Sequence, residues 1–188
     1  MAYSHTRLAP QTLCRRFFLT AIGLLGLITI TPFLQQSEAQ VSQYDLSARI
    51  TFLLSKYTSW PANPGKDADD VLVGVYGNGA KNFAALNGEI LKAHEIKVVA
   101  IDARTPAAVL SQCAVIFTSD GADLDRTAEA TNGKPVFIVH LGEGNKKACV
   151  TLFQTDGKLA FEVNRGTLQK RKLQMSSQAL KLAAKVNK

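Results

Sequence analysis

The side chains that most often carry out chemistry are sparse and scattered in this chain of 188 residues. The histidines beyond the N-terminal segment are His94 and His140, which are far apart in sequence and have no ligand-like neighbours, whereas a zinc site needs three or four convergent ligands. Neither Ser119-Asp120-Gly121 nor Ser176-Ser177 matches the Gly-x-Ser-x-Gly pattern of a nucleophile elbow. No pair of carboxylates stands out. We therefore expect a protein that is not an enzyme and that uses no cofactor or metal.

Two further segments occupy positions where α/β proteins handle phosphate. Gly77-Asn78-Gly79 follows an apolar run, as phosphate-binding turns do, but it lacks the third glycine of the dinucleotide fingerprint and the Lys-Ser/Thr ending of a P-loop. Asp120 follows a later strand, as the phosphoacceptor of a response regulator does, but no acidic pair follows the first strand to hold Mg²⁺. We interpret Gly77-Asn78-Gly79 as a turn that requires a permissive backbone.

Cys113 and Cys149 are the cysteines that follow residue 39. An oxidising compartment would permit one bridge between them. The predicted sheet has Cys113 where its third strand begins and Cys149 after its fourth strand ends, which puts them at opposite ends. A disulfide needs Cα atoms within about 7 Å. We therefore expect buried free thiols, with a Cys113–Cys149 bond as the alternative.

Residues 1–39 have the three parts of an export signal. Arg7, Arg15 and Arg16 precede a mostly apolar run over residues 17–34, and Ser37-Glu38-Ala39 has small residues at the positions that favour cleavage after Ala39. The alternative is a retained membrane anchor, because the apolar run nearly reaches the ~18–20 residues that span a bilayer. The sequence thus predicts an export signal over 1–39 and a single domain over 40–188 that acts outside the cytoplasm.

The export route is left open by the sequence. Cys14-Arg15-Arg16-Phe17-Phe18-Leu19 resembles the twin-arginine signal of proteins that are exported folded, although Thr20 replaces its usual final lysine. Export by the general route fits residues 1–39 equally well.

Positive charge is concentrated at the C-terminal end of the chain. The sequence has 22 basic and 15 acidic residues, a net charge of +7, and from Arg165 to Lys188 there are seven basic residues and no acidic one. Such a segment suits anionic lipid headgroups or an acidic protein surface, and the alternative is an ordinary solvated face. We do not expect nucleic acid as a partner outside the cytoplasm.

Short apolar runs alternate with helical patterns along the domain, which is typical of a parallel sheet with right-handed crossovers. We expect an α/β fold of three layers, in which helices flank a mostly parallel sheet. The strands are expected over residues 71–76, 96–101, 114–118 and 135–139. The helices are expected over residues 43–57, 83–91, from 105 onward, and 123–131.

A hairpin and a helix are expected to close the domain. Asp156-Gly157 lies between two strand-like runs, residues 151–155 and 158–163, and is a strong signal for a two-residue hairpin turn. This hairpin would extend the sheet with antiparallel strands. Ser176 or Ser177 can then cap a basic amphipathic helix. Its apolar stripe, at helical spacing, consists of Met175, Ala179, Leu182, Ala183 and Val186.

Several segments, in this order and spacing, resemble the YfiR/HmsC-like periplasmic family over about residues 44–186. The C-terminal ones are closest to the Phe-Glu-Ile-Asn, Leu-x-Ile-Ser-Ser and Leu-x-Leu-Ala pattern of that family. The segments are Thr58-Ser59-Trp60-Pro61, Val73-Gly74-Val75-Tyr76-Gly77, Gln112-Cys113-Ala114-Val115-Ile116-Phe117, Phe161-Glu162-Val163-Asn164, Leu173-Gln174-Met175-Ser176-Ser177 and Leu180-Lys181-Leu182-Ala183.

The resemblance implies a regulator that is not a catalyst. Members are associated with binding the periplasmic sensor domain of an inner-membrane diguanylate cyclase and holding the cyclase inactive. Release raises cyclic-di-GMP and favours biofilm. An outer-membrane lipoprotein and a second copy of the chain are further candidate partners. Better-known members carry two disulfides, and the strand position that would pair with Cys113 is Gly74 here, which argues against redox gating.

Five residues of the resembling C-terminal segments are candidates for partner binding. Phe161, Leu173 and Leu180 are expected to offer apolar anchors, and Glu162 and Asn164 to supply polar specificity. Core packing is the alternative role for Phe161 and Leu180, and helix capping for Asn164.

The alternative function is a small-ligand sensing or solute-binding module. It would use the carboxyl ends of the strands near Gly77, Ser119 and Leu141, where open α/β sheets bind ligands.

Overall fold

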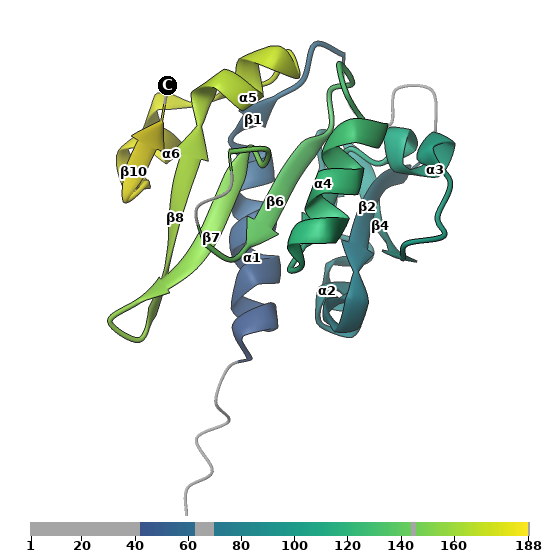
Figure 1. Ribbon diagram of the computed structural model, residues 1–188, viewed down its shortest axis with the longest axis horizontal. Helices are drawn as coiled ribbons and strands as arrows, with labels where there is room; N and C mark the ends of the chain where they lie inside the picture. The colour runs from purple at the N-terminus through teal and green to yellow at the C-terminus, as the bar shows by residue number, and fades with distance from the viewer. Residues whose placement is uncertain (1–41, 63–69, 144–145, 188) are drawn as a thin grey trace, which may run out of the picture. The chain divides into compact units, whose positions relative to one another are not determined.

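An eight-stranded sheet is the centre of the part of the chain that the computed structural model describes, residues 42–62, 70–143 and 146–187 (Figure 1). The strand order is β10-β8-β7-β6-β5-β2-β4-β3. Neighbouring strands are parallel except in the pairs β3–β4 and β7–β8. The strands are β2 (Asp70–Tyr76), β3 (Ile90–Leu91), β4 (His94–Ile101), β5 (Val115–Thr118), β6 (Phe137–Leu141), β7 (Val150–Thr155), β8 (Lys158–Asn164) and β10 (Lys185–Asn187).

Helices cover both faces of this sheet, which confirms the predicted three-layer α/β fold. One face packs against α1 (Gln43–Lys56) and α2 (Ala80–Phe83), and the other against α3 (Ala107–Gln112) and α4 (Gly121–Ala130). Figure 1 shows α4 in front of the sheet and α1 behind it. Alternate residues of the central strands β2, β5 and β6 therefore enter two apolar clusters. Val73 belongs to the cluster that contains Leu54 of α1, whereas Ile116 belongs to the cluster that contains Leu124 of α4.

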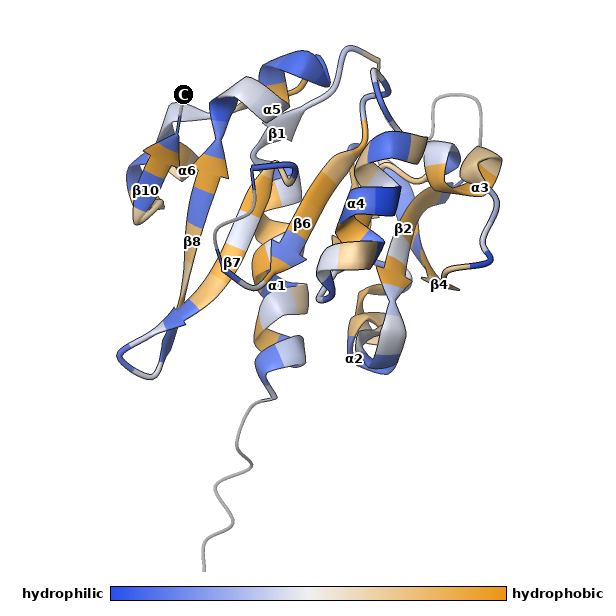
Figure 2. Cartoon of the chain, in the orientation of Figure 1, coloured by the Kyte–Doolittle hydropathy of each residue, from blue (hydrophilic) through white to orange (hydrophobic). Residues whose placement is uncertain are grey.

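The central strands are apolar along their length because both of their sides are buried. All four residues of β5 are buried, and Figure 2 shows hydrophobic residues along β2 and β6. In β8, near the edge of the sheet, hydrophobic and hydrophilic residues alternate only at the end of the strand, from Phe161 to Asn164 (Figure 2), and Val163 is the buried residue of the strand.

The first helix agrees with its prediction. Ser42 is its N-cap, and its side chain accepts a hydrogen bond from the Tyr44 amide at 3.3 Å. Trp60-Pro61 follows soon after the helix ends, and the Trp60 ring packs edge-on against Phe137 with centroids 6.3 Å apart.

The helix predicted over residues 83–91 is wrong in its second half. The chain makes a 3₁₀ turn, η1 (Gly77–Gly79), then α2, then a second turn, η2 (Ala84–Leu86), and enters strand β3 at Ile90. Gly88 has a φ of +82°, which ends the helical run. The Asn87 side chain accepts a hydrogen bond from the Val98 amide of β4 at 2.7 Å. The segment is thus held against the sheet edge.

The predicted hairpin is confirmed. Asp156 and Gly157, with φ of 49° and 71°, form the two-residue turn between β7 and β8. Both residues are left-handed, as the common two-residue hairpin turn requires. The expectation that both strands would be antiparallel to the sheet needs one correction, since β7 runs parallel to β6 and only β8 is antiparallel to its neighbour β7.

The C-terminal segment is more broken than predicted. After β8 come α5 (Arg165–Lys170), the two-residue strand β9 (Gln174–Met175), α6 (Ser177–Leu182) and then β10. Helix α6 begins after Ser176, as expected, but ends at Leu182, and Val186 lies in β10 beside Val163 of β8. The free edge of β8 offers unpaired backbone groups, and these make a strand more favourable than further helix.

Strand β9 pairs with β1 (Thr58–Ser59), just after α1, and so ties the C-terminal segment to the first helix. The predicted export signal over residues 1–39 lies outside the described residues. Within the described ranges, every helix is too short or too polar to cross a bilayer.

Candidate functional site

An open recess of about 440 Å³ lies between α1, β8 and α6, and we call it the apolar groove. Three of the large apolar side chains that line it are exposed: Leu53 at 47%, Tyr57 at 38% and Leu182 at 70%. Its other lining residues are Ile50, Leu54, Thr155, Asp156, Lys158, Leu159, Ala160, Phe161, Ala179 and Ala184. Most of these are apolar, so the groove presents hydrophobic surface to solvent.

The groove exists because three elements meet without filling the space between them. Leu54 of α1 turns into the core, and this leaves Leu53 on the outer side of the helix. Helix α6 is placed by its cap, where the Ser176 hydroxyl accepts a hydrogen bond from the Ala179 amide at 3.3 Å and the Ser176 amide donates to the Tyr57 carbonyl at 2.9 Å. The end of α1 therefore fixes the position of α6.

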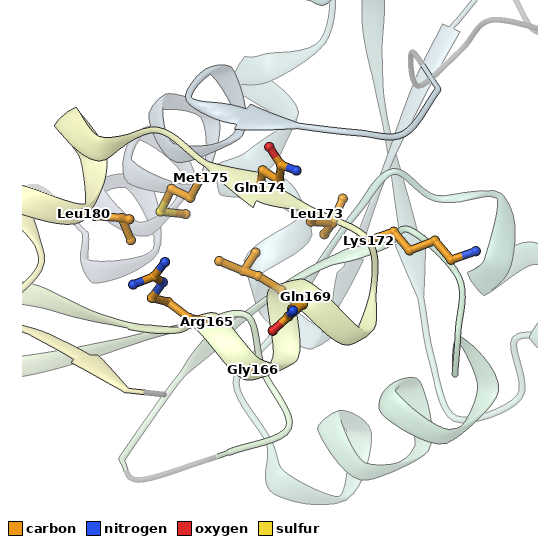
Figure 3. Close-up of a pocket in the computed structure, with 9 residues that line it drawn as sticks. Arg165, Gly166, Gln169, Lys172, Leu173, Gln174, Met175 and Leu180 are labelled. Carbon is orange, nitrogen blue, oxygen red and sulfur yellow. The ribbon is translucent and has the colours of Figure 1, made fainter.

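A second recess, of about 700 Å³, lies among α5, β9 and α6, and we call it the cationic pocket (Figure 3). In the figure the guanidinium of Arg165 extends toward Leu180, and Lys172 lies at the other end with its ammonium directed outward. The lining residues are Arg165, Gly166, Leu168, Gln169, Lys172, Leu173, Gln174, Met175 and Leu180. None of them is acidic.

The three apolar residues predicted to bind a partner are not brought together on one surface. Phe161 is half-buried and lines the apolar groove. Leu173, only 2% exposed, and the half-buried Leu180 line the cationic pocket. All three also pack with the core cluster under α1, as the alternative interpretation expected for Phe161 and Leu180.

The two predicted polar residues make hydrogen bonds within the chain. The Asn164 side chain caps α5 by accepting from the Thr167 amide at 2.9 Å, and its amide group donates to the Lys146 carbonyl at 2.9 Å. The carboxylate of Glu162 accepts from the side chain of Asn187 at 3.3 Å. Asn164 thus has the capping role that was its alternative, and Glu162 helps to hold β10.

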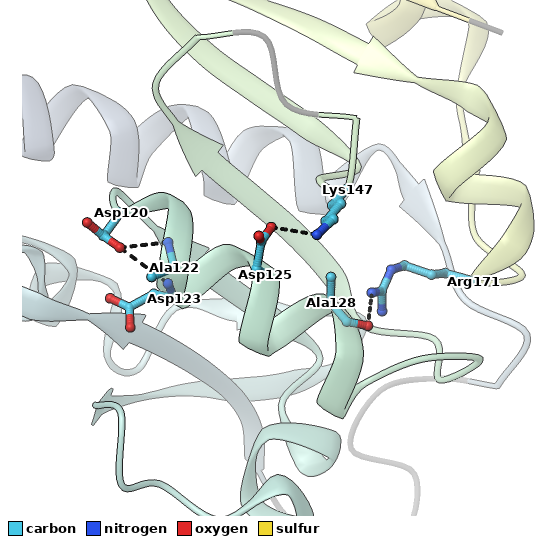
Figure 4. A network of polar contacts seen from close by, with 7 residues as sticks. All are labelled: Asp120, Ala122, Asp123, Asp125, Ala128, Lys147 and Arg171. Carbon is cyan, nitrogen blue, oxygen red and sulfur yellow. Dashed lines mark hydrogen bonds and ion pairs between the residues drawn. The ribbon is translucent and has the colours of Figure 1, made fainter.

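Arg171 has a role that sequence reasoning missed. It is 5% exposed, and it donates hydrogen bonds to the Thr131 carbonyl and hydroxyl, both at 3.0 Å, and to the Ala128 carbonyl at 3.4 Å (Figure 4). These carbonyls end α4, where a cation also suits the helix dipole. Burial lowers the pKa of Arg171. In the sequence it stands within a basic run, and its distant partner leaves no local signal.

A third, smaller recess lies at the carboxyl ends of the strands, where the alternative function would place a small ligand. Ser119 and Leu141 line a pocket of about 290 Å³ together with Tyr44, whose hydroxyl donates to the Ser119 hydroxyl at 3.4 Å. Gly77 is not among the lining residues. Asp120 caps α4 by accepting from the Ala122 amide at 2.7 Å (Figure 4).

The two histidines stand in different settings. His140 is 5% exposed, and its Nδ1 is hydrogen-bonded to the Thr118 hydroxyl at 2.9 Å. Burial lowers the pKa of His140, which favours the neutral form of the ring. His94 lies in β4, at the far side of the sheet. No group of three metal-ligating side chains that could hold an ion occurs in the described ranges.

Cys113 and Cys149 are free and buried. The expectation that they lie at opposite ends of the sheet is wrong, because the chain turns back after β6 and the Cys149 amide donates to the Ile138 carbonyl at 2.9 Å. They are separated instead by the sheet, since Cys113 packs in the cluster under α3 and α4 and Cys149 in the cluster under α1. Burial raises the pKa of each thiol to about 11.

A search of curated proteins finds no match. The sequence model of one family, described as YfiR/HmsC-like, matches residues 44–184, which are about three quarters of the chain. The match includes α1, most of the sheet and α6, and with them both recesses of the C-terminal segment. The chain therefore belongs to the YfiR/HmsC-like family.

Proposed function

We propose that this chain is a periplasmic, non-enzymatic regulator that represses an inner-membrane diguanylate cyclase by binding the periplasmic sensor domain of that enzyme. Membership of the YfiR/HmsC-like family points to the coarser role, a periplasmic regulator of cyclic-di-GMP signalling. The direct contact with the cyclase, and the surface that makes it, are the parts we propose.

The observation that carries the proposal is the exposed apolar groove. Large apolar side chains scattered singly over a surface need no explanation, but a contiguous apolar recess is typical of an interaction site. Leu182 is 70% exposed and Leu53 47% exposed at its rim. Fully burying one such side chain against a partner would contribute roughly 1.5–3 kcal/mol.

Charge around the groove favours an apolar segment with acidic flanks. Lys158 and Asp156 belong to the lining itself, and Lys181 and Lys185 are exposed residues of the adjoining α6 and β10, so basic residues outnumber the acidic one. Apolar contact would supply most of the affinity, and the lysines would favour an acidic partner and speed its approach. The partner we envisage is a helix or strand of the sensor domain with two or three apolar residues on one side.

The five predicted residues take different parts in this proposal. Phe161, in the wall of the apolar groove, is proposed as a direct contact, whereas Leu180, on the other side of α6, is proposed to hold that helix against the core. Glu162 is proposed to add a polar contact at the edge of the sheet. Leu173 and Asn164 are proposed to act through the fold, by holding β9 and α5 in place.

The test is binding to the periplasmic sensor domains of the membrane-bound diguanylate cyclases of the source bacterium, each produced separately and titrated calorimetrically with the purified protein. We expect one domain to bind. The double variant Leu53→Asp/Leu182→Asp should weaken binding by at least about a hundredfold, because it puts two charges into a desolvated contact.

The matched control is Ile90→Asp. Ile90 is 52% exposed and lies in β3, at the opposite edge of the sheet from β10. This variant should bind as the unchanged protein does. Failure of every sensor domain to bind, or equal binding by the double variant, would overturn the proposal. Circular dichroism of all three proteins would show whether the substitutions leave the fold intact.

A further inference from the structure

The cationic pocket has features that the proposed partner contact does not use. Its interior is apolar where Leu168 and Leu173, both buried, meet Met175 and Leu180. Arg165 stands at one end (Figure 3). A recess of about 700 Å³ falls within the usual size range of small-molecule sites, which are mainly apolar with a few polar groups that fix orientation.

Arg165 and Lys172 have no ion-pair partner among the described residues, and neither side chain makes a hydrogen bond there. Both are exposed. The guanidinium of Arg165 extends over the apolar interior toward Leu180, whereas the ammonium of Lys172 is directed outward (Figure 3). A planar guanidinium can donate hydrogen bonds to both oxygens of a carboxylate in a bidentate pair, which gives Arg165 the better geometry for an anion.

We propose that the cationic pocket binds a small organic carboxylate with an apolar body. Medium-chain fatty acids and aromatic acids are the two simplest ligands of this class. The carboxylate pairs with Arg165, and the apolar body lies against Leu173, Met175 and Leu180. Gln169 and Gln174, whose side chains are neutral, leave the pocket without a negative charge that would oppose the ligand. The site lies apart from the strand-end pocket at Ser119 and Leu141.

This site does not depend on the proposed partner contact. Its ligand would touch Leu180 of α6, whereas the apolar groove is lined by Ala179 and Leu182 of the same helix. The two recesses therefore lie on different sides of α6, and either one can be tested alone.

The experiment is calorimetric titration of the purified full chain with decanoate and with 2-naphthoate, which separate the aliphatic from the aromatic form of the ligand. Acetate keeps the charge without the body, and decyltrimethylammonium keeps the body with the opposite charge. We expect saturable binding of decanoate or 2-naphthoate and none of the other two. Binding should weaken when salt is raised from about 50 to about 500 mM.

Variants locate the site. Arg165→Gln should lower the affinity by at least about tenfold, because it removes a charge-assisted pair. Lys170→Gln is the matched control, since Lys170 is an exposed cation of the same helix outside the pocket lining, and its affinity should stay within about twofold of the unchanged protein.

Three results would overturn the proposal. They are no binding of either carboxylate at millimolar concentration, equal binding of decyltrimethylammonium, and equal losses of affinity in Arg165→Gln and Lys170→Gln. A failure here would leave the cyclase-binding proposal untouched, because that proposal rests on the apolar groove and is tested with different variants.

Discussion

Arg171 donates hydrogen bonds to the last carbonyls of α4, which water would otherwise solvate. Its guanidinium satisfies the Thr131 and Ala128 carbonyls in a setting where water has little access. Without it, the half-buried Ala128 carbonyl would lose a charged donor and the Thr131 carbonyl would keep only the Lys134 amide as its donor. A hydrogen bond to a charged group typically contributes about 1.5–3 kcal/mol. This residue therefore joins the C-terminal segment to the helix on the opposite face of the sheet.

We predict that Arg171→Ala lowers the free energy of unfolding by about 3 kcal/mol, whereas Lys172→Ala, at the exposed neighbouring position, changes it by less than about 0.5 kcal/mol. Urea unfolding followed by circular dichroism measures both. Equal effects of the two substitutions would show that Arg171 contributes only as one more surface charge.

Gly74 stands where a bridge to Cys113 could form. A Cβ added at Gly74 would lie 3.1 Å from the Cys113 sulfur. In a disulfide the Cβ of one residue lies about 3 Å from the sulfur of the other, given a sulfur–sulfur bond of about 2.04 Å. The same Cβ would come 2.9 Å from the end of the Ile101 side chain, which must shift slightly.

We predict that Gly74→Cys forms a disulfide with Cys113 under oxidising conditions and raises the free energy of unfolding by about 2 kcal/mol, below the chain-entropy value for so long a loop because Ile101 must move. Peptide mapping by mass spectrometry would identify the bridge. Reduction should remove the gain. A variant whose introduced thiol stays free after oxidation would contradict this account of the contact.

Residue types in the sequence revealed some of these roles and hid others. Ser42, Asp156 and Gly157 were predictable because a cap or a turn involves neighbours a few positions away. Arg171 was not, since its partners are some forty positions earlier in the chain. Cys149 was misplaced for the same reason, because the return of the chain beside Ile138 depends on tertiary packing.

Among the elements, the β7–β8 hairpin is the one whose local sequence most directly sets its geometry. Gly157 has a φ of +71° in its turn, a conformation that a side chain disfavours. Gly121, the first residue of α4, has no such constraint, and a Cβ there would meet nothing within 4 Å.

We predict that Gly157→Ala lowers the free energy of unfolding by about 1 kcal/mol, while Gly121→Ala leaves it unchanged or slightly higher. The difference comes from the backbone conformation, since neither added methyl group meets a neighbour. Thermal and urea unfolding of the pair would measure it. If the two substitutions had equal effects, the positive φ at Gly157 would carry no cost.

The C-terminal elements show where periodicity is insufficient. Met175, Leu182 and Val186 fit one helical stripe, yet they belong to β9, α6 and β10. Hydrogen bonding to the edge of β8 outweighs helix continuation, and a single sequence does not reveal that this edge is free. The same applies to Ile90. Helical spacing predicts a helix at this residue, but it pairs with the edge of β4 and forms strand β3.

At the scale of the whole molecule, the fold class could be predicted from the sequence because its central strands are continuous apolar runs separated by helical patterns. The order of the strands and the positions of the recesses could not be predicted from the sequence, because they depend on contacts between distant elements. Phe161 and Leu180, which both belong to the family pattern, line two different recesses on either side of α6. The surface that would bind a partner became visible only when α1, β8 and α6 were assembled.

The central claim is that this assembled surface, and no chemistry of bond-making, represses a membrane-bound cyclase. The most direct measurement is the cellular cyclic-di-GMP content of a strain that lacks the gene, complemented in turn with the unchanged chain, with Leu53→Asp/Leu182→Asp and with Ile90→Asp at equal protein levels. We predict that deletion raises cyclic-di-GMP and that the unchanged chain and Ile90→Asp restore the lower level. The double variant should leave the level raised. A deletion without effect on cyclic-di-GMP, or full repression by the double variant, would contradict the account.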